Sequence, residues 1–587
     1  MSLRGRLFII FLLVFSSIIY AQTISSIKVD GEKKFSEDDI IKWCGVRTGD
    51  KIFPALIDSV KSNLALQFGN RGYLHSSFKN SNLEEIDSAH YQLNIVLEEG
   101  EPTNVKNIFI SGIDSVSNNK IILPFMFLKG RTFDKFSLEQ DINSALTYFE
   151  NNGYPFAKII ISSIYFYTDS TSGEYFADIN LKAERGIYCK IDRIEIDGNL
   201  STKDYVILRE LRLNTGQEYS QRIIDKIPEK LNRLGFFEPV GQPEFFLNSK
   251  NEGVLRIKVK EKQTNNFDGI IGYIPPTTPG TSGYLTGLVN ISLRNIFGTG
   301  RAAAIRWQQY DIYSQDLEIK YLEPWLFSYP FNFTASLFQR KQDSTYVQRK
   351  IEGSLEYLAT ENISASVFLS TEAVIPTENG STLFTVFNST SVTTGVNITI
   401  DTRDDPYSPT QGILFENSYS FSRKKINGPQ QFITSGVSTN VNLQRLTLDL
   451  SGYYELFPKQ VIALGLHGRE LRGSFFEVSD LFRLGGANTL RGYREDQFLG
   501  NRVTWTNLEY RLLLTRRTFG FAFFDTGYYL RNADPQNNIP KSEGFKIGYG
   551  VGFNVETSLG VLRVSFALAK GDSFSQGKIH FGIVNEF

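Results

Sequence analysis

The chain has 587 residues, too many for one hydrophobic core, so several domains are expected. Its formal net charge of −1 provides no basic excess and argues against nucleic-acid binding. Phenylalanine and tyrosine are abundant, with 47 and 28 residues, against only 2 methionines. This enrichment is typical of β-strands and of membrane interfaces, where aromatic rings lie at the level of the lipid headgroups.

Residues 1–21 predict a secretory signal peptide. Arg4 and Arg6 precede an apolar run over residues 7–19, and Ala21 provides a suitable cleavage point. An uncleaved anchor is the alternative, but the run is short for a membrane span. No later stretch holds 18 consecutive apolar residues, so no transmembrane helix is expected. An exported chain of this kind is periplasmic, extracellular or a β-barrel.

Three segments of about 80 residues then share one pattern of strands, helices and glycines. Each opens with a short alternating strand that ends in a glycine, and the three opening glycines are Gly31, Gly112 and Gly198. In each, the second helix ends at a glycine that precedes an aromatic residue, and these glycines are Gly72, Gly153 and Gly235. Glycine suits a left-handed helix end because it has no Cβ. The pattern predicts three α+β domains of order β-α-α-β-β, over residues 22–102, 103–186 and 187–262.

From residue 263 to 587 the pattern changes to segments of about ten residues with alternating polarity, separated by turns. One face of each segment is apolar and the other is small or polar, as in residues 562–569. A membrane barrel directs its apolar face to lipid and its polar face to the lumen. We therefore expect an antiparallel transmembrane β-barrel of about sixteen strands. Proline-containing breaks at 323–325 and 401–406 are expected to be periplasmic turns, and polar stretches such as 376–382 extracellular loops.

The last segment predicts how the barrel closes. Ile579, Phe581 and Ile583 lie on one face of this segment, and the chain ends on Phe587. An amphipathic last strand with a terminal aromatic residue is the pattern by which outer-membrane barrels are recognised for insertion. Asn585 interrupts the apolar face, so the match is imperfect. We expect these four residues to form the C-terminal signal and to close the barrel.

One loop sequence between two strands points to a family. Residues 484–493 read Leu-Gly-Gly-Ala-Asn-Thr-Leu-Arg-Gly-Tyr, and this segment resembles the loop motif of the BamA, TamA and two-partner-secretion transporters. The three repeats likewise resemble polypeptide-transport-associated (POTRA) domains. The resemblance covers nearly the whole chain after residue 21. It implies that the latch motif, Leu490, Arg491, Gly492 and Tyr493, folds back into the barrel lumen.

Two carboxylates are the candidate partners of the Arg491 guanidinium, whose planar fork binds carboxylates at two points. Glu509 shares its strand face with Asn507 and Arg511, so alternation places it in the lumen. Asp525 shares parity with a run of phenylalanines, so the family resemblance supports its assignment more than alternation does. The alternative is that Arg491 lies in an exposed loop, in solvent.

The resemblance implies an outer-membrane protein assembly factor, with its repeats in the periplasm. Its clients would be unfolded outer-membrane or secreted polypeptides, received by strand pairing and inserted into lipid at a seam between residues 267–274 and 578–587. Accessory periplasmic or inner-membrane proteins are further expected partners. Three repeats favour the TamA-type layout, because BamA usually has five.

Other functions remain open. A two-partner-secretion pore shares the latch motif but typically has two repeats and a plug helix. A passive porin would leave the repeats without a role, and the repeats themselves could be inert spacers. The four histidines show no metal-ligand spacing, and no nucleophile or phosphate-binding motif is found, so we expect neither a metal, nor a cofactor, nor enzymatic activity.

Overall fold

The computed structural model describes residues 22–31, 34–112, 129–274, 284–309, 311, 313–342, 345–377, 386–406, 408–433, 438–515, 517–533, 539–557 and 560–584. The expected signal peptide lies outside these residues. The chain divides into two compact units, and the third repeat is shared between them. The first unit comprises the residues up to Ile194 together with residues 214–225 and 245–255. The second unit comprises residues 195–213, 226–244 and 256–587.

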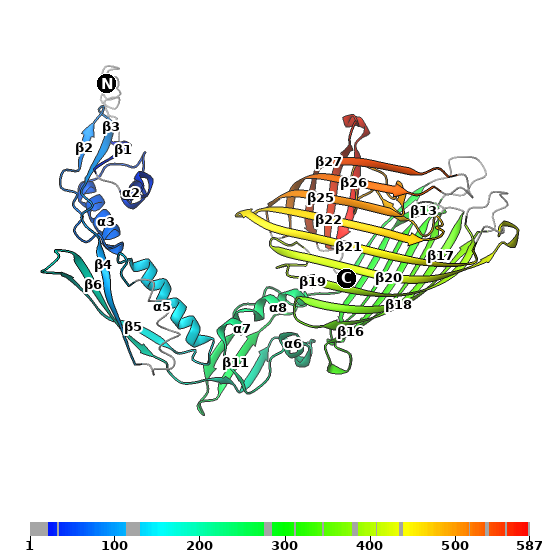
Figure 1. Cartoon of the computed structure of the whole chain (residues 1–587), viewed down its shortest axis with the longest axis horizontal. Coiled ribbons are helices and arrows are strands. Elements are labelled where there is room, and N and C mark those ends of the chain that lie inside the picture. Colours follow the sequence, from blue (N-terminus) through cyan, green and yellow to red (C-terminus); the bar gives the residue numbers. More distant parts are fainter. Residues whose placement is uncertain are drawn as a thin grey trace, which may run out of the picture. The chain divides into compact units, whose positions relative to one another are not determined.

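The first repeat is a three-stranded sheet covered by two helices (Figure 1). Its elements are β1 (Thr23–Gly31), α2 (Glu37–Trp43), α3 (Leu56–Asn70), β2 (Asn82–Glu85) and β3 (His90–Leu97). The sheet order is β1-β3-β2, with β3 parallel to β1 and antiparallel to β2. Helix α3 buries Val60, Leu64 and Phe68 at helical spacing, in one core with Leu93 and Ile95 of β3.

The second and third repeats have the same sheet topology. The second contains β4 (Thr103–Ser111), α5 (Lys135–Glu150), β5 (Lys158–Thr168) and β6 (Tyr175–Glu184), in the order β4-β6-β5. Its expected first helix lies between residues 113 and 128, outside the described residues. The third contains β8 (Arg193–Asp197), α6 (Asp204–Leu211), α7 (Gln221–Asp225), α8 (Ile227–Leu234), β10 (Glu244–Leu247) and β11 (Gly253–Lys258), in the order β8-β11-β10. A minor pair, β7 (Lys190–Ile191) with β9 (Gln217–Glu218), lies alongside.

The third repeat departs from the expected two helices, because its second helical segment is divided into α7 and α8. Pro228 occupies the first turn of α8. Proline is tolerated there, since the N–H that it lacks has no partner within the helix, and a new helix starts at this point. The glycine that follows, Gly235, caps α8 in the left-handed conformation with φ +69°.

The opening glycine of each repeat has a common structural reason. Gly31, Gly112 and Gly198 all have positive φ, and each faces the closing strand of its own repeat. A Cβ atom there would lie between 1.9 and 2.3 Å from a backbone carbonyl oxygen, of Leu97, Ala183 and Val259 respectively. At this position the opening segment can therefore lie against the closing strand only because the glycine has no side chain.

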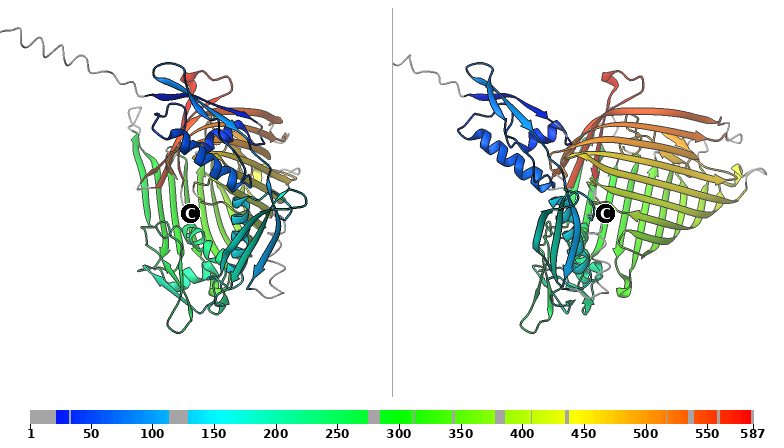
Figure 2. Two further views of the ribbon diagram at one scale, coloured as in Figure 1. Left: turned by 90° about the vertical axis from the view of Figure 1, so that its left-hand side faces the viewer. Right: turned by 60° about the vertical axis from the view of Figure 1, so that its left-hand side comes forward.

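Residues 266–584 form one antiparallel sheet of sixteen sequential strands, which confirms the expected number (Figure 2). The strands are β12 (Asn266–Ile274), β13 (Tyr284–Ile296), β14 (Arg301–Gln309), β15 (Gln315–Glu323), β16 (Phe331–Gln342), β17 (Tyr346–Leu358), β18 (Ile363–Pro376), β19 (Asn388–Asp401), β20 (Gly412–Gly428), β21 (Asn440–Phe457), β22 (Gln460–Gly473), β25 (Arg502–Leu513), β26 (Phe519–Arg531), β27 (Ser542–Thr557), β28 (Gly560–Ala569) and β29 (Lys578–Val584).

Alternation along these strands separates an apolar outer face from the lumen. In β25, Leu508, Tyr510 and Leu512 are exposed, whereas Glu509 and Arg511 are buried. Exposed apolar and buried charged side chains are the arrangement of a membrane barrel. Among the helices of the described residues, none is long and apolar enough to span a membrane.

The ends of β15, β17 and β19 and the turns after them contact the third repeat within the second unit. The Trp325 indole Nε1 donates to the Glu210 carboxylate at 2.8 Å, and the Arg233 guanidinium donates to the Arg403 carbonyl at 2.7 Å. The Arg212 guanidinium donates to the Leu358 carbonyl at 2.8 Å. Within the second unit, these contacts place the helices of the third repeat at one rim of the barrel.

Candidate functional site: the lumen latch and the barrel seam

The latch loop, residues 474–501, connects β22 to β25 and folds as a small hairpin of its own. Its strands β23 (Phe482–Leu484) and β24 (Phe498–Gly500) pair with each other, outside the sixteen-stranded sheet. Gly485 and Gly486 both have positive φ, which turns the chain after β23. Leu484 and Leu490 are completely buried against Val503 and Trp505 of β25. This small apolar cluster fixes the loop against the inside of the wall.

The Arg491 side chain lies in this loop and contacts both predicted partners. Its Nε and Nη2 donate to the two oxygens of Asp525 at 2.8 and 2.7 Å, and its Nη1 donates to Glu509 Oε1 at 2.7 Å. The Arg491 backbone N–H also donates to Asp525, at 3.1 Å. The Asp525 side chain is 0% exposed and that of Arg491 4%, so the pair is shielded from water. Bidentate geometry and burial both strengthen such a bond.

Glu509 binds two further arginines. Its carboxylate accepts from the Arg511 guanidinium at 2.8 Å and from Arg563 Nη2 of β28 at 2.6 Å. The cluster therefore contains three guanidinium groups and two carboxylates, and it joins the latch loop to strands β25, β26 and β28. A buried charge without a partner is costly, so each member fixes the position of the others.

Three phenylalanines of β26 surround the cluster and explain why alternation is a weak guide to Asp525. Phe519, Phe521 and Phe523 share the inward face of β26 with Asp525 and are all buried. The Arg491 guanidinium lies 3.7 Å from the centre of the Phe523 ring, and that of Arg563 lies 4.7 Å from the centre of Phe521. These rings face the lumen because they stack on arginines, and not because the lumen is apolar.

Glycines on the neighbouring strands allow the latch motif to approach the wall. A Cβ on Gly548 of β27 would lie 1.9 Å from the Arg491 carbonyl oxygen, so only glycine fits there. Gly492 itself has φ +93° and lies against the backbone of Leu568 in β28. The Tyr493 hydroxyl donates to the Ile547 carbonyl at 3.1 Å. All four residues of the latch motif therefore contact the barrel or the cluster beside it.

A residue that sequence reasoning did not assign, His580, also contacts the motif. Its Nε2 accepts from the Gly492 backbone N–H at 3.0 Å. Nε2 must be unprotonated to accept, so the imidazole is neutral with its proton on Nδ1. His580 lies in β29, between two outward-facing apolar residues, and this alternation was the available signal.

The first and last strands, β12 and β29, form the two ends of the sixteen-strand order. Within the described residues, no ladder joins them. Ile579 and Phe581 of β29 are exposed on the outer face, at 61% and 68%. Ile583 lies in β29 opposite Leu562, and Phe587 lies outside the described residues. The same described ranges contain no group of three or more His, Cys, Asp or Glu side chains that could hold a metal ion.

Comparison with known families agrees with this architecture. The Omp85 superfamily domain matches residues 295–587, and the surface antigen variable number repeat, a POTRA model, matches residues 22–100 and 189–262. The chain belongs to the Omp85 superfamily. The second repeat lies outside the matched residues but has the same sheet order as the other two. As an Omp85 protein, the chain resides in the outer membrane, with its N-terminal repeats in the periplasm.

Several curated relatives are named outer membrane protein assembly factor BamA. The chain is 24% identical over 471 residues to the outer membrane protein assembly factor BamA of Nitratidesulfovibrio vulgaris, covering 74% of this chain and 55% of the relative. It is 23% identical over 323 residues to BamA of Buchnera aphidicola, covering 53% and 49%. The chain thus spans about half the length of these relatives. Among solved structures, CdiB from Escherichia coli superimposes with TM-score 0.50 at 12% identity, over 91% of this chain and 99% of that one, which supports the fold alone.

Proposed function

We propose that this Omp85 protein assembles other outer-membrane proteins, templating their insertion at the seam between β12 and β29. The observation that carries this proposal is the sixteen-stranded sheet whose end strands share no ladder in the described residues. A strand edge in a membrane leaves backbone N–H and C=O groups without partners, and a client strand can supply them. No cofactor or nucleotide is required, because the client's own folding and burial in lipid drive the reaction.

The second repeat provides the surface on which a client would first bind. Its edge strand β5 is 11 residues long, whereas the equivalent strands β2 and β10 have 4 each. Ile160, Ile161, Tyr165 and Phe166 of β5 are between 40% and 64% exposed. A long, apolar, β-prone edge is avoided in soluble proteins because it pairs with other strands. An extended, unfolded polypeptide is the partner that matches such an edge.

Depletion of the protein followed by quantitative proteomics of the outer membrane tests the assembly role. Loss of many barrels indicates a general factor, and loss of a few indicates a specialised one of the TamA type. Complementation with Ile160→Lys/Tyr165→Lys should fail to restore those barrels, whereas Leu200→Lys should restore them. Leu200 is 94% exposed and lies outside any strand, so it provides a matched change of an exposed apolar residue.

Secretion of a passenger polypeptide through the lumen is the competing function. The latch loop fixes several side chains inside the barrel, which opposes a permanently open pore. Purified protein in planar bilayers should therefore show only brief or small conductance. A large, sustained conductance together with unchanged outer-membrane barrels after depletion would refute the assembly role and favour secretion.

A further inference from the structure

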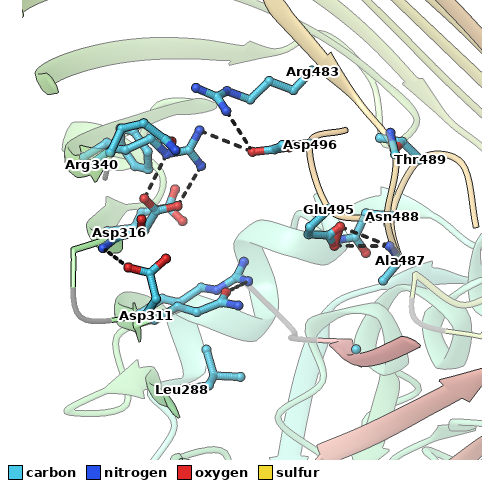
Figure 3. A pocket seen from close by; sticks show the side chains of 18 of the residues that line it. Leu288, Asp311, Asp316, Arg340, Arg483, Ala487, Asn488, Thr489, Glu495 and Asp496 are labelled. Atoms are coloured by element: carbon cyan, nitrogen blue, oxygen red, sulfur yellow. Dashed lines mark hydrogen bonds and ion pairs between the residues drawn. The ribbon is translucent and has the colours of Figure 1, made fainter. Parts of the chain in front are cut away.

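The latch loop makes a second set of contacts, through Arg483 and Asp496, with Arg340 and its neighbours (Figure 3). Arg483 Nη1 lies 3.2 Å from Asp496 Oδ2, and Arg483 Nη2 donates to the Tyr346 hydroxyl at 3.1 Å. Arg340 Nη1 lies 3.8 Å from the same Asp496 oxygen, and its other nitrogens bind Asp316 at 2.7 and 2.9 Å. Residues 483–496 are thus held by β16 and β17, strands of the first half of the barrel.

The middle of this segment, between its two ends, is attached to the last strands of the barrel. The Gly492 backbone N–H donates to His580 Nε2 of β29, and Arg491 binds Asp525 of β26. A cavity of about 640 Å³ lies along the segment, and its walls come from both ends of the sheet. Leu288 and Arg306 line it from β13 and β14, and Gly582 lines it from β29. The same fourteen residues therefore contact both the last strand and the first half of the barrel.

We infer that residues 483–496 form a strap across the seam, which controls how readily β29 separates from its neighbours. His580 attaches the strap to the last strand, and Asp496 with Tyr346 attaches it to the first half of the barrel. These three are positioning residues, since each acts by holding the strap and not by binding the client. The inference rests on the proposed function only for its biological purpose; the strap itself concerns the free protein.

The contacts have the strength that a reversible device requires. His580 contributes one neutral hydrogen bond, and its loss should increase opening roughly three- to tenfold. Asp496 is 41% exposed on its side chain, so its ion pairs are weakened by solvent and the Tyr346 hydrogen bond adds to them. Loss of both Asp496 and Tyr346 contacts should increase opening by roughly threefold.

Hydrogen–deuterium exchange of the full chain in lipid nanodiscs measures this opening. His580→Leu should accelerate exchange in residues 578–584 by roughly three- to tenfold, and His580→Gln, which keeps an acceptor at a similar place, should restore slow exchange. The decisive variant is Asp496→Asn/Tyr346→Phe, which should also accelerate exchange in β29, although neither residue touches that strand. Combining it with His580→Leu should add little, because both changes break the same connection between β29 and the first half of the barrel.

Matched controls separate the strap from general loosening. Asp311→Asn removes a carboxylate from the same cavity, but Asp311 accepts hydrogen bonds from its own turn, at Tyr313 and Ser314. Ile579→Val alters β29 on its outer face. Both should leave exchange in residues 578–584 unchanged. If Asp496→Asn/Tyr346→Phe accelerates exchange only in the strap and in β16 and β17, the strap is refuted. That variant also decides the matter if His580→Leu does not fold.

Measuring how fast the same variants insert client proteins into vesicles tests the strap and the proposed function separately. Faster exchange in β29 with unchanged insertion would retain the strap and refute templating at the seam. Unchanged exchange with normal insertion would refute the strap and leave templating intact.

Discussion

Replacement of Arg491 by alanine should destabilise the barrel, and the structure indicates where the cost arises. Asp525 loses both guanidinium hydrogen bonds and retains only the backbone N–H of residue 491. Glu509 loses one arginine but keeps Arg511 and Arg563. Since the Asp525 side chain is 0% exposed, its carboxylate cannot regain water without movement of the loop. Breaking a buried pair in this way costs about 3–5 kcal/mol of unfolding free energy.

A second substitution tests whether Asp525 is the source of that cost. In Arg491→Ala/Asp525→Asn the buried charge is gone, and an amide with incomplete hydrogen bonding costs about 1–3 kcal/mol. The double variant should therefore recover roughly 2 kcal/mol of the loss. Arg491→Ala/Glu509→Gln should recover nothing, because a neutral amide in place of the Glu509 carboxylate leaves Arg511 and Arg563 without their counter-charge.

Urea unfolding of the purified protein in lipid vesicles gives these differences. The 4 tryptophans report on unfolding by fluorescence, and electrophoretic mobility without heating reports the folded fraction independently. Arg491→Lys should be intermediate, because an ammonium group cannot bind Asp525 at two points. The reasoning is refuted if Arg491→Ala lies within about 0.5 kcal/mol of wild type, or if Glu509→Gln rescues it as well as Asp525→Asn does.

Three further predictions concern other parts of the chain. Gly548→Ala should displace the Arg491 carbonyl and lower stability in the same urea assay. Gly582→Ala should not, because its new Cβ would meet only the Arg563 Cβ, at 4.0 Å. Equal effects of the two substitutions would contradict the close approach of Arg491 to Gly548. Burial raises the pKa of the Cys44 thiol to about 12, so Cys44 should resist maleimide near pH 8 until the protein is denatured, and rapid labelling of folded protein would be inconsistent with its 0% exposure. Burial also raises the pKa of Glu210 above its ordinary 4.5, against the opposing effect of Arg209, so the folded state favours the protonated acid and stability should fall as pH rises above 4.5. Glu210→Gln should lose this decline in thermal denaturation scans, and an unchanged pH profile would exclude Glu210 as its cause.

The sequence predicted those features that local pattern determines. Alternation with period two determines which face of each strand meets lipid, and it yielded the sixteen strands and the inward position of Glu509. The opening glycines could be located because their spacing repeats, although the carbonyl oxygens that require them became visible only in the fold. Periodicity did not anticipate the division between α7 and α8, since a proline is compatible with the first turn of a helix.

Features that depend on contacts between distant segments could not be predicted from local sequence patterns. Asp525 was ambiguous because Phe519, Phe521 and Phe523 share its face, and their inward orientation is explained only by the arginines of three other segments. In the sequence, His580 is one polar residue among others in an amphipathic strand, and its hydrogen bond to Gly492 depends on the folded position of the latch loop. The ion pair between Asp496 and Arg340 joins segments that lie far apart in the sequence, and no local pattern encodes such a contact.

The energies of the latch and of the strap place them in different roles. An unpaired backbone group in lipid costs several kcal/mol, so the edges of β12 and β29 favour pairing with a strand that supplies partners. The buried cluster around Arg491 and Asp525, at about 3–5 kcal/mol, is strong enough to keep the loop in place throughout. The His580 hydrogen bond, at about 1 kcal/mol, changes an opening equilibrium only a few-fold. A client strand that pairs with several backbone groups of the edge gains more free energy than the His580 hydrogen bond contributes. It gains more than the Arg491 cluster contributes only if many groups pair. The loop would therefore stay anchored through Arg491 while its tie to β29 yields, and the barrel could open at the seam without losing its interior.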